Sequence, residues 1–198
     1  MDRKIFFYLI LLAILLFLSG IYMDNAEIKT TALHAGLFFV AIYFIYKKDL
    51  NTTLRELGIP GNTGRNALHA ILGLLFMFAA LFALGFLSNM IGMNDQQAIA
   101  KKVGTFSDYL IIFAVVLAPI SEEMFFRGLL VSRYGILLPA IAFGAMHFSY
   151  GSYAEIAGAL IIGLILGWVY KSSKSIVPAI AIHMAYNLIA VWVLRSML

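Results

Sequence analysis

Two adjacent carboxylates lie in a stretch of the chain that is otherwise apolar enough to be embedded in lipid. Glu122 and Glu123 fall within residues 109–131, and Arg127 follows four residues after the second glutamate. A charge near the centre of a bilayer costs at least a few kcal/mol, so an ionisable cluster there indicates a functional site. Residues four apart share one face of a helix, in the order that favours an ion pair, so Glu123 is expected to pair with Arg127. Glu122 is rotated about 100° away and lacks that partner.

Two histidines and one asparagine are expected at a similar depth in the membrane. At 1.5 Å per residue from the nearer ends of their predicted spans, the glutamates lie about 12 Å deep, His183 about 10 Å and His147 about 17 Å. Asn187 follows His183 by four residues and therefore shares its helix face. Three different spans thus place polar groups within one or two helical turns of each other.

This set of side chains is suited to the hydrolysis of an acyl bond by water. A carboxylate excluded from bulk water can act as a general base near neutral pH, and a histidine can orient the water. A second histidine and an asparagine amide can donate hydrogen bonds to the developing oxyanion. The alternative is a divalent metal such as zinc that activates the water, with Glu122, His147 and His183 as its ligands.

The signatures of other catalytic mechanisms are missing from the sequence. The chain has no cysteine, which excludes disulfides, thiolate nucleophiles and iron–sulfur ligation. It also contains no His-Glu-x-x-His zinc helix, no Gly-x-Ser-x-Gly elbow and no Gly-x-Gly-Asp motif. A hydrolase built from this chain would depend on its glutamates and histidines.

Each polar residue also has a structural explanation. An ion pair between successive turns of one helix is more often structural than catalytic, and this is the expectation for Glu123 and Arg127. Glu122 is the hardest to explain in this way, because no local partner neutralises it. Polar side chains also serve as interhelical or interfacial contacts, and this explanation is open for His147 and Asn187. It is the expected one for His34 and His69, which lie near the ends of their predicted spans.

The composition identifies a polytopic membrane protein. Of the 198 residues, 63% are hydrophobic and 12% are charged, whereas a soluble domain is about half apolar and a quarter charged. We therefore predict an all-α transmembrane helical bundle, a single integral membrane domain over residues 1–198 with about seven spans and a range of six to eight. The first span lacks a small-x-small cleavage site, so it is expected to be retained. The predicted spans are Ile5–Met23, Thr31–Tyr46, Ala67–Ile91, Tyr109–Val131, Ile136–His147, Tyr153–Tyr170 and Ile176–Leu194.

The distribution of basic residues predicts the orientation. With the N-terminus in the cytoplasm, nine Lys and Arg residues fall on the cytoplasmic side and four on the other, with Arg127 left out as intramembrane. The positive-inside rule then favours a cytoplasmic N-terminus, an external C-terminus and a polar cluster nearer the cytoplasm. The nine are Arg3, Lys4, Lys47, Lys48, Arg55, Arg65, Arg133, Lys171 and Lys174.

Two connectors and one proline complete the layout. The segment Asn51–Asn66 holds three glycines and Pro60 and is expected to turn. The segment Asn94–Ser107 mixes polar and apolar residues, and an interfacial helix or a solvated connector would suit it equally. Pro119 removes a helix hydrogen bond just before the glutamates. Broken membrane helices usually line a protein-filled or wet cavity.

Three short motifs, in order and on separate spans, resemble those of the CPBP family of intramembrane proteases. This family groups the type II CAAX prenyl proteases with bacteriocin-processing and abortive-infection-like proteins. The run from Glu122 to Arg127 resembles its Glu-Glu-x-x-x-Arg motif, Phe143 to His147 its Phe-x-x-x-His motif, and His183 to Asn187 its His-x-x-x-Asn motif. The resemblance covers residues 118–187, a little over a third of the chain, which would be the protease core.

The resemblance implies a role for each matched residue. Glu122 and His147 would activate the water, while His183 and Asn187 would stabilise the oxyanion. Glu123 and Arg127 would support the site. Members of the family have been described both as metal-independent glutamate proteases and as metalloproteases, and the metal-independent form with no cofactor is expected here.

The predicted function is an intramembrane endopeptidase that cleaves near the C-terminus of a membrane-associated substrate. The resemblance makes a prenylated CAAX-type protein one such substrate. The expected partners are membrane lipid and a hydrophobic or lipidated peptide or protein, with no nucleic acid, and the expected location is the cell membrane with the site toward the cytoplasm. The alternative is a non-proteolytic membrane protein, either a bacteriocin-immunity protein, a scaffold or a proton-coupled transporter, that uses the same polar cluster.

Overall fold

The computed structural model describes the chain except for residues 1–2, 47–48, 60 and 93–94, and the described part contains helices and no strand. Lys47, Lys48 and Pro60, which entered the sequence predictions, lie outside the described residues. In the first half of the chain the helices are α1 (Arg3–Tyr22), α2 (Ala26–Ile45), α3 (Leu50–Glu56), α4 (Thr63–Met90) and α5 (Gln96–Gly104). In the second half they are α6 (Asp108–Ile112), η1 (Phe113–Leu117), α7 (Ala118–Glu123), η2 (Met124–Val131), α8 (Ser132–Tyr134), α9 (Leu137–Met146), η3 (His147–Tyr150), α10 (Tyr153–Ser173) and α11 (Val177–Ser196).

The predicted all-α membrane bundle is confirmed. Five helical segments of the described chain are long and apolar enough to cross a membrane, namely Ala26–Ile45, Thr63–Met90, Asp108–Tyr134, Tyr153–Ser173 and Val177–Ser196. Shorter apolar helices over Phe7–Tyr22 and Leu137–Met146 coincide with the first and fifth predicted spans. Every predicted span therefore corresponds to a helix.

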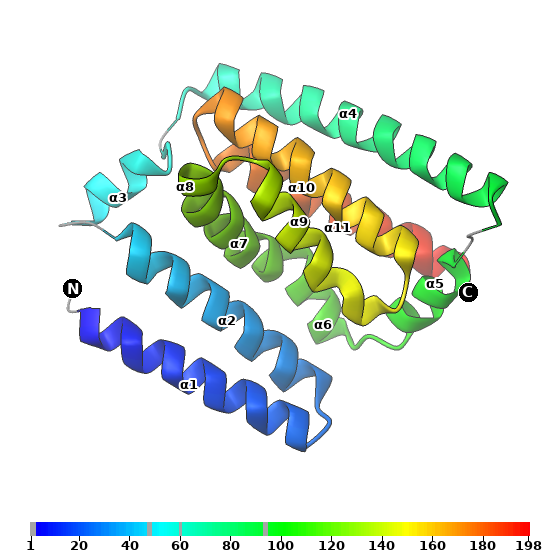
Figure 1. The fold of residues 1–198 in the computed structure, drawn as a ribbon, viewed down its shortest axis with the longest axis horizontal. Helices are drawn as coiled ribbons and strands as arrows, with labels where there is room; N and C mark the ends of the chain where they lie inside the picture. The colour runs from blue at the N-terminus through cyan, green and yellow to red at the C-terminus, as the bar shows by residue number, and fades with distance from the viewer. Residues whose placement is uncertain (1–2, 47–48, 60, 93–94) are drawn as a thin grey trace.

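The helices form a bundle with two lipid-facing edges. In Figure 1, α1 packs on α2 at one edge, α4 lies along the opposite edge, and α7, α9, α10 and α11 fill the space between them. Only 11% of the most apolar 18-residue stretch of α4 is buried inside the protein. The corresponding share is 50% for the segment that carries the glutamates and 50% for α10. The glutamate-bearing segment is thus far more covered by other helices than α4 is, and a buried charge can find partners there.

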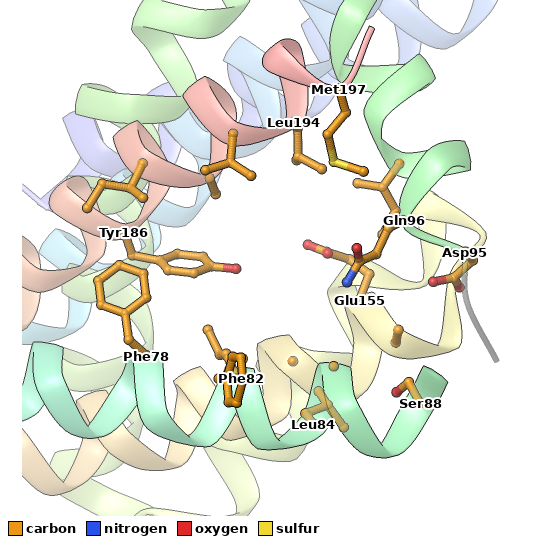
Figure 2. Close-up of a pocket in the computed structure, with 18 of the residues that line it drawn as sticks. Phe78, Phe82, Leu84, Ser88, Asp95, Gln96, Glu155, Tyr186, Leu194 and Met197 are labelled. Carbon is orange, nitrogen blue, oxygen red and sulfur yellow. The ribbon is translucent and has the colours of Figure 1, made fainter. Parts of the chain in front are cut away.

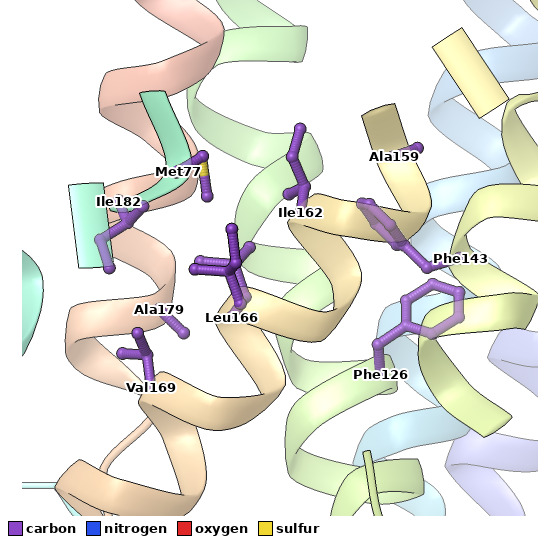
Figure 3. Packing of buried hydrophobic residues seen from close by; sticks show 10 residues of the cluster. Met77, Phe126, Phe143, Ala159, Ile162, Leu166, Val169, Ala179 and Ile182 are labelled. Carbon is purple, nitrogen blue, oxygen red and sulfur yellow. The ribbon is translucent and has the colours of Figure 1, made fainter. Parts of the chain in front are cut away.

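The main core cluster holds the central helices together. Met77 of α4, Leu166 and Val169 of α10 and Ile182 of α11 are almost fully buried and pack against one another (Figure 3). On the other side of α10, a Cβ on Gly163 would come within 2.9 Å of the backbone of α9, so glycine permits the close approach of these two helices.

The connector between α2 and α4 turns as predicted and also contains a short helix. Asp49 caps α3 by accepting hydrogen bonds from the backbone and side chain of Thr52, and these bonds hold the pKa of its carboxyl below the ordinary value. Gly58 adopts φ +72° and approaches the backbone of Lys174, where a Cβ would clash. The connector is thereby fixed against the start of α11, since Ile176 N donates to Leu57 O at 2.9 Å.

The helix that carries the glutamates contains two π-helical stretches. The π-helical stretches η1 and η2 flank α7, which begins with Ala118 and Pro119. Since proline has no N–H, it cannot bond to the preceding turn, and a wider turn accommodates the loss. Short π-helical stretches are frequent at functional sites because they alter which side chains share a face.

Candidate active site

Glu123 and Arg127 form a fully buried ion pair on one helix face. Arg127 Nη1 donates to Glu123 Oε1 at 2.8 Å, and their side chains are 1% and 0% exposed. Arg127 also donates from Nη2 to Gly163 O of α10 at 3.3 Å, and its guanidinium lies 4.8 Å from the ring centre of Phe143 on α9. The spacing predicted this pair, and the contacts of Arg127 connect the glutamate helix with α9 and α10.

His183 of α11 joins the two glutamates. Its Nδ1 lies 2.8 Å from Glu123 Oε1, and its Nε2 lies 3.6 Å from Glu122 Oε2. The charge of Arg127 keeps the Glu123 carboxyl group ionised, and an ionised carboxylate can only accept hydrogen bonds. The proton in the contact with His183 therefore belongs to Nδ1–H of the histidine. The carboxylate thereby orients the ring and directs Nε2 toward Glu122, as carboxylate–histidine pairs do in hydrolases.

The hydrogen-bonding partner of Glu122 is His34 of α2. His34 Nε2 lies 3.0 Å from Glu122 Oε1, and both side chains are 11% exposed. On the other side of the ring, Nδ1 donates to Thr30 O at 2.8 Å, and the ring packs edge-on against Phe113. The expectation that His34 is structural missed this contact.

A sequence signal for His34 was present at the start of its helix. The predicted span began at Thr31, which put His34 near an end. In the structure α2 begins at Ala26, because Asn25 accepts a hydrogen bond from Ile28 N and caps the helix. His34 is therefore about 12 Å along the helix from its first residue, at 1.5 Å per residue. Asparagine before an apolar segment is a helix-start signal that would have moved His34 into the span.

His147 lies at the end of α9 and is half-buried. Its Nδ1 donates to Phe143 O at 2.8 Å, so the neutral ring presents Nε2 as its acceptor. His147 lies within electrostatic range of Glu122 and also of Glu155 on α10. The structure thus places it near the glutamates, although the hydrogen bond to Glu122 comes from His34.

Asn187 stabilises the broken part of the glutamate helix. Its Nδ2 donates at 2.8 Å to Ala114 O in η1. In a π-helix the carbonyl of each residue accepts a hydrogen bond from the N–H five residues later. For Ala114 that residue is Pro119, which has no N–H, so the Ala114 carbonyl lacks its helical donor. One N–H of the amide therefore satisfies this carbonyl, and an asparagine amide has a second N–H.

The two glutamates differ in accessibility and in hydrogen bonding. The Glu122 side chain keeps 11% of its accessible surface, whereas that of Glu123 keeps none. Among the described residues, Glu123 Oε2 and Arg127 Nε are buried without a hydrogen-bond partner from the protein. Such atoms are usually bonded to ordered water. Glu122 is thus the more accessible of the two carboxylates.

Comparison with known proteins agrees with the motifs. Residues 105–189 match the family model described as type II CAAX prenyl endopeptidase Rce1-like. The matched segment contains Glu122, Glu123 and Arg127 as well as the two later histidine motifs, whereas His34 lies before it. No curated protein and no solved structure matches the chain. With its glutamates and histidines gathered in a helical membrane bundle, the chain is similar over residues 105–189 to the Rce1-like type II CAAX prenyl endopeptidases, the family that its three motifs resemble.

Proposed function

We propose that this protein is an intramembrane endopeptidase that hydrolyses a peptide bond near the C-terminus of a membrane-associated substrate, such as a prenylated CAAX-type protein. The observation that carries the proposal is the environment of Glu122, a carboxylate inside a membrane helix with a histidine on each side. Glu123 differs from it, because its side chain is fully buried and is paired with Arg127 on its own helix. The catalytic unit would be the single membrane domain, with residues 118–187 as its core.

The charges of the cluster balance when it holds one mobile proton. Arg127 neutralises one of the two carboxylates, and buried charges are otherwise strongly disfavoured. The second negative charge is cancelled by one proton shared among Glu122, His34 and His183. His34 Nδ1 already carries the proton that it donates to Thr30 O. His34 Nε2 lies 3.0 Å from Glu122 Oε1, and a hydrogen bond between these two atoms requires one further proton, on either the histidine or the glutamate.

The proposed reaction uses water as the nucleophile. Glu122 takes a proton from a water that His147 orients through Nε2, and the water oxygen forms a bond to the scissile carbonyl carbon. The carbonyl oxygen becomes an oxyanion, and the cluster then holds two protons: one stays between Glu122 and His34, and Glu122 passes the one taken from the water to Nε2 of His183, 3.6 Å away. This Nε2–H and the second N–H of Asn187 stabilise the oxyanion. When the C–N bond breaks, this proton returns through Glu122 to the leaving amine.

A divalent metal is the alternative way to activate the water. Zinc in a catalytic site is held by three protein ligands that converge at about 2.0–2.2 Å. Among the described residues, no group of three or more His, Cys, Asp or Glu side chains converges in this way. His183 Nδ1 is engaged by Glu123, and Glu122 Oε1 by His34. Glu122, His147 and His183 as arranged do not fit the metal, and the proposed steps do not pass through one.

The direct test is cleavage by the wild-type protein in lipid nanodiscs. A peptide with a prenylated or otherwise hydrophobic C-terminal tail should be cut near that end, with water oxygen in the new carboxyl group, as mass spectrometry in H₂¹⁸O would detect. Cleavage should persist after treatment with a chelator, in protein that carries no stoichiometric metal. Gradient-driven uptake into liposomes without any peptide product would instead support the transporter alternative.

His34 gives a second expectation, because the family match does not include it. Glutamine in its place keeps a donor for Glu122 but cannot carry a proton, so His34→Gln should lower kcat by about 100-fold. The matched control is His69→Gln, since half-buried His69 also bonds through Nδ1 to the carbonyl four residues earlier but lies on α4. Unchanged kcat in His34→Gln would show that His34 acts only as a hydrogen-bond donor. The dependence of kcat on pH, measured from pH 5 to 9, should change shape in His34→Gln and not in His69→Gln.

The proposed location is the cell membrane, with the N-terminus and the glutamate site toward the cytoplasm. The excess of basic residues at one end of the bundle supports this orientation. Membrane lipid would then be the solvent through which a lipidated or hydrophobic substrate reaches Glu122. Labelling of single cysteines introduced near residues 55 and 195 would report which side each end occupies.

A further inference from the structure

An apolar cavity with an acidic end lies next to α11, the helix that also carries His183 of the glutamate cluster. It has a volume of about 380 Å³ and is lined by residues of α4, α5, α10 and α11 and by Asp95 before α5. Its walls are mainly aliphatic and aromatic, whereas Glu155 and Asp95 bring carboxyl groups to it. In Figure 2 the Glu155 carboxyl group and the Tyr186 hydroxyl point toward the same central space from opposite walls. None of the described residues that line the cavity is basic.

Two contacts fix the position of the cavity relative to Glu122. Arg127 bonds to Gly163 O, so the end of the arginine side chain links the glutamate helix to α10 at this residue, and the two helices run in the same direction (Figure 1). Glu122 precedes Arg127 by five residues, and Glu155 precedes Gly163 by eight. The difference of three residues corresponds to about 4.5 Å along the helix axis. On α11, Tyr186 is likewise three residues beyond His183, which contacts both glutamates.

The charge of the cavity determines what it can accept. Glu155 and Asp95 interact with each other, and no lining cation offsets them. An anionic ligand, such as a phosphate or a free carboxylate, would be repelled. A lysine or arginine side chain is complementary, because its apolar stem can lie along aliphatic walls while its charged end reaches a carboxylate. The volume leaves room for such a side chain and part of the chain that carries it.

We propose that this cavity is a specificity subsite that binds a basic side chain of the substrate near the scissile bond. The proposal rests on the proposed peptidase function and specifies its substrate class. His147 lies within electrostatic range of both Glu122 and Glu155, and η3, which begins with His147, packs against α10, the helix that carries Glu155. A substrate with a basic residue in the cavity would therefore extend past His147 toward Glu122.

The test compares peptides that differ in one side chain. Lysine and norleucine share an apolar stem and differ in charge, so each position flanking the cleavage site is tested with this pair in nanodiscs. Wild-type protein should cleave the lysine peptide with roughly tenfold higher kcat/KM at one position. Glu155→Gln should reduce this ratio to about one, and Glu155→Lys should make a glutamate peptide the better substrate. The ratio is informative even if Glu155→Gln alters His147, because both peptides share that change.

The controls separate this proposal from the function on which it rests. Exposed Asp108 on α6 is the matched site, and Asp108→Asn should leave the lysine-to-norleucine ratio unchanged. Equal cleavage of both peptides at every position would overturn the subsite and leave the peptidase intact. A Glu155-dependent preference in peptide binding without cleavage would support the subsite and overturn the peptidase. Neither cleavage nor a binding preference would overturn both.

Discussion

Replacing Glu122 by glutamine is expected to lower kcat by about 10²–10⁴-fold, the range typical for loss of a general base. Glutamine has nearly the same shape and can donate to His34 Nε2, so the contact 3.0 Å long in the wild type is retained. What the amide cannot do is accept a proton from water. The protein should therefore fold and bind substrate normally while cleavage is lost, measured as initial rates of peptide hydrolysis in nanodiscs.

The control for Glu122→Gln is a glutamate away from the cluster. Glu27 in the first turn of α2 is exposed, and Glu27→Gln should retain wild-type kcat. Full activity of Glu122→Gln would refute the proposed role of this carboxylate. Loss of activity accompanied by loss of folding would implicate structure instead, so thermal unfolding of both variants is measured alongside the rates.

The second large effect concerns stability. Arg127→Met is expected to destabilise the fold by about 3–5 kcal/mol, because it leaves the Glu123 carboxylate buried without its cation. The arginine side chain is 1% exposed and the glutamate side chain is not exposed at all, so neither group has solvent as a substitute. The measurement is the free energy of unfolding in mixed micelles, from titration with a denaturing detergent.

A double variant distinguishes the lost charge pairing from lost packing. In Arg127→Met combined with Glu123→Gln, no unpaired charge remains, so a large part of the stability should return. An exposed arginine provides the comparison, and Arg55→Met on α3 should change stability by only about 0.5 kcal/mol. If the double variant is as unstable as Arg127→Met, the cost lies in the contacts of the guanidinium with Gly163 and Phe143 instead.

The parts of the structure that were predictable are those set by local sequence. Spans were predicted because hydropathy over about 20 residues reflects the thickness of the bilayer. The pairing of Glu123 with Arg127 followed from helix geometry, because residues four apart are neighbours in any helix. The helix α5 was one of two options for its connector, because a nine-residue amphipathic segment is short enough for its surroundings to decide.

His34 shows where a sequence prediction fails. Its contact with Glu122 spans 88 positions in the chain, and no periodicity along α2 indicates which face meets the glutamates. Asn187 is a related case, since its bond to Ala114 O depends on a π-helical register that Pro119 permits but does not specify. Both contacts depend on the rotation of one helix against another.

By itself the sequence determined that this chain is a helical membrane protein and that it carries two carboxylates, one with a partner on its own helix. It did so because lipid demands apolar spans and because helix geometry fixes neighbours within a span. Only the tertiary structure decided that His34 and His183 flank Glu122, and that an acidic cavity adjoins the cluster. These contacts join helices far apart in the chain, and the packing of many side chains together sets how those helices meet.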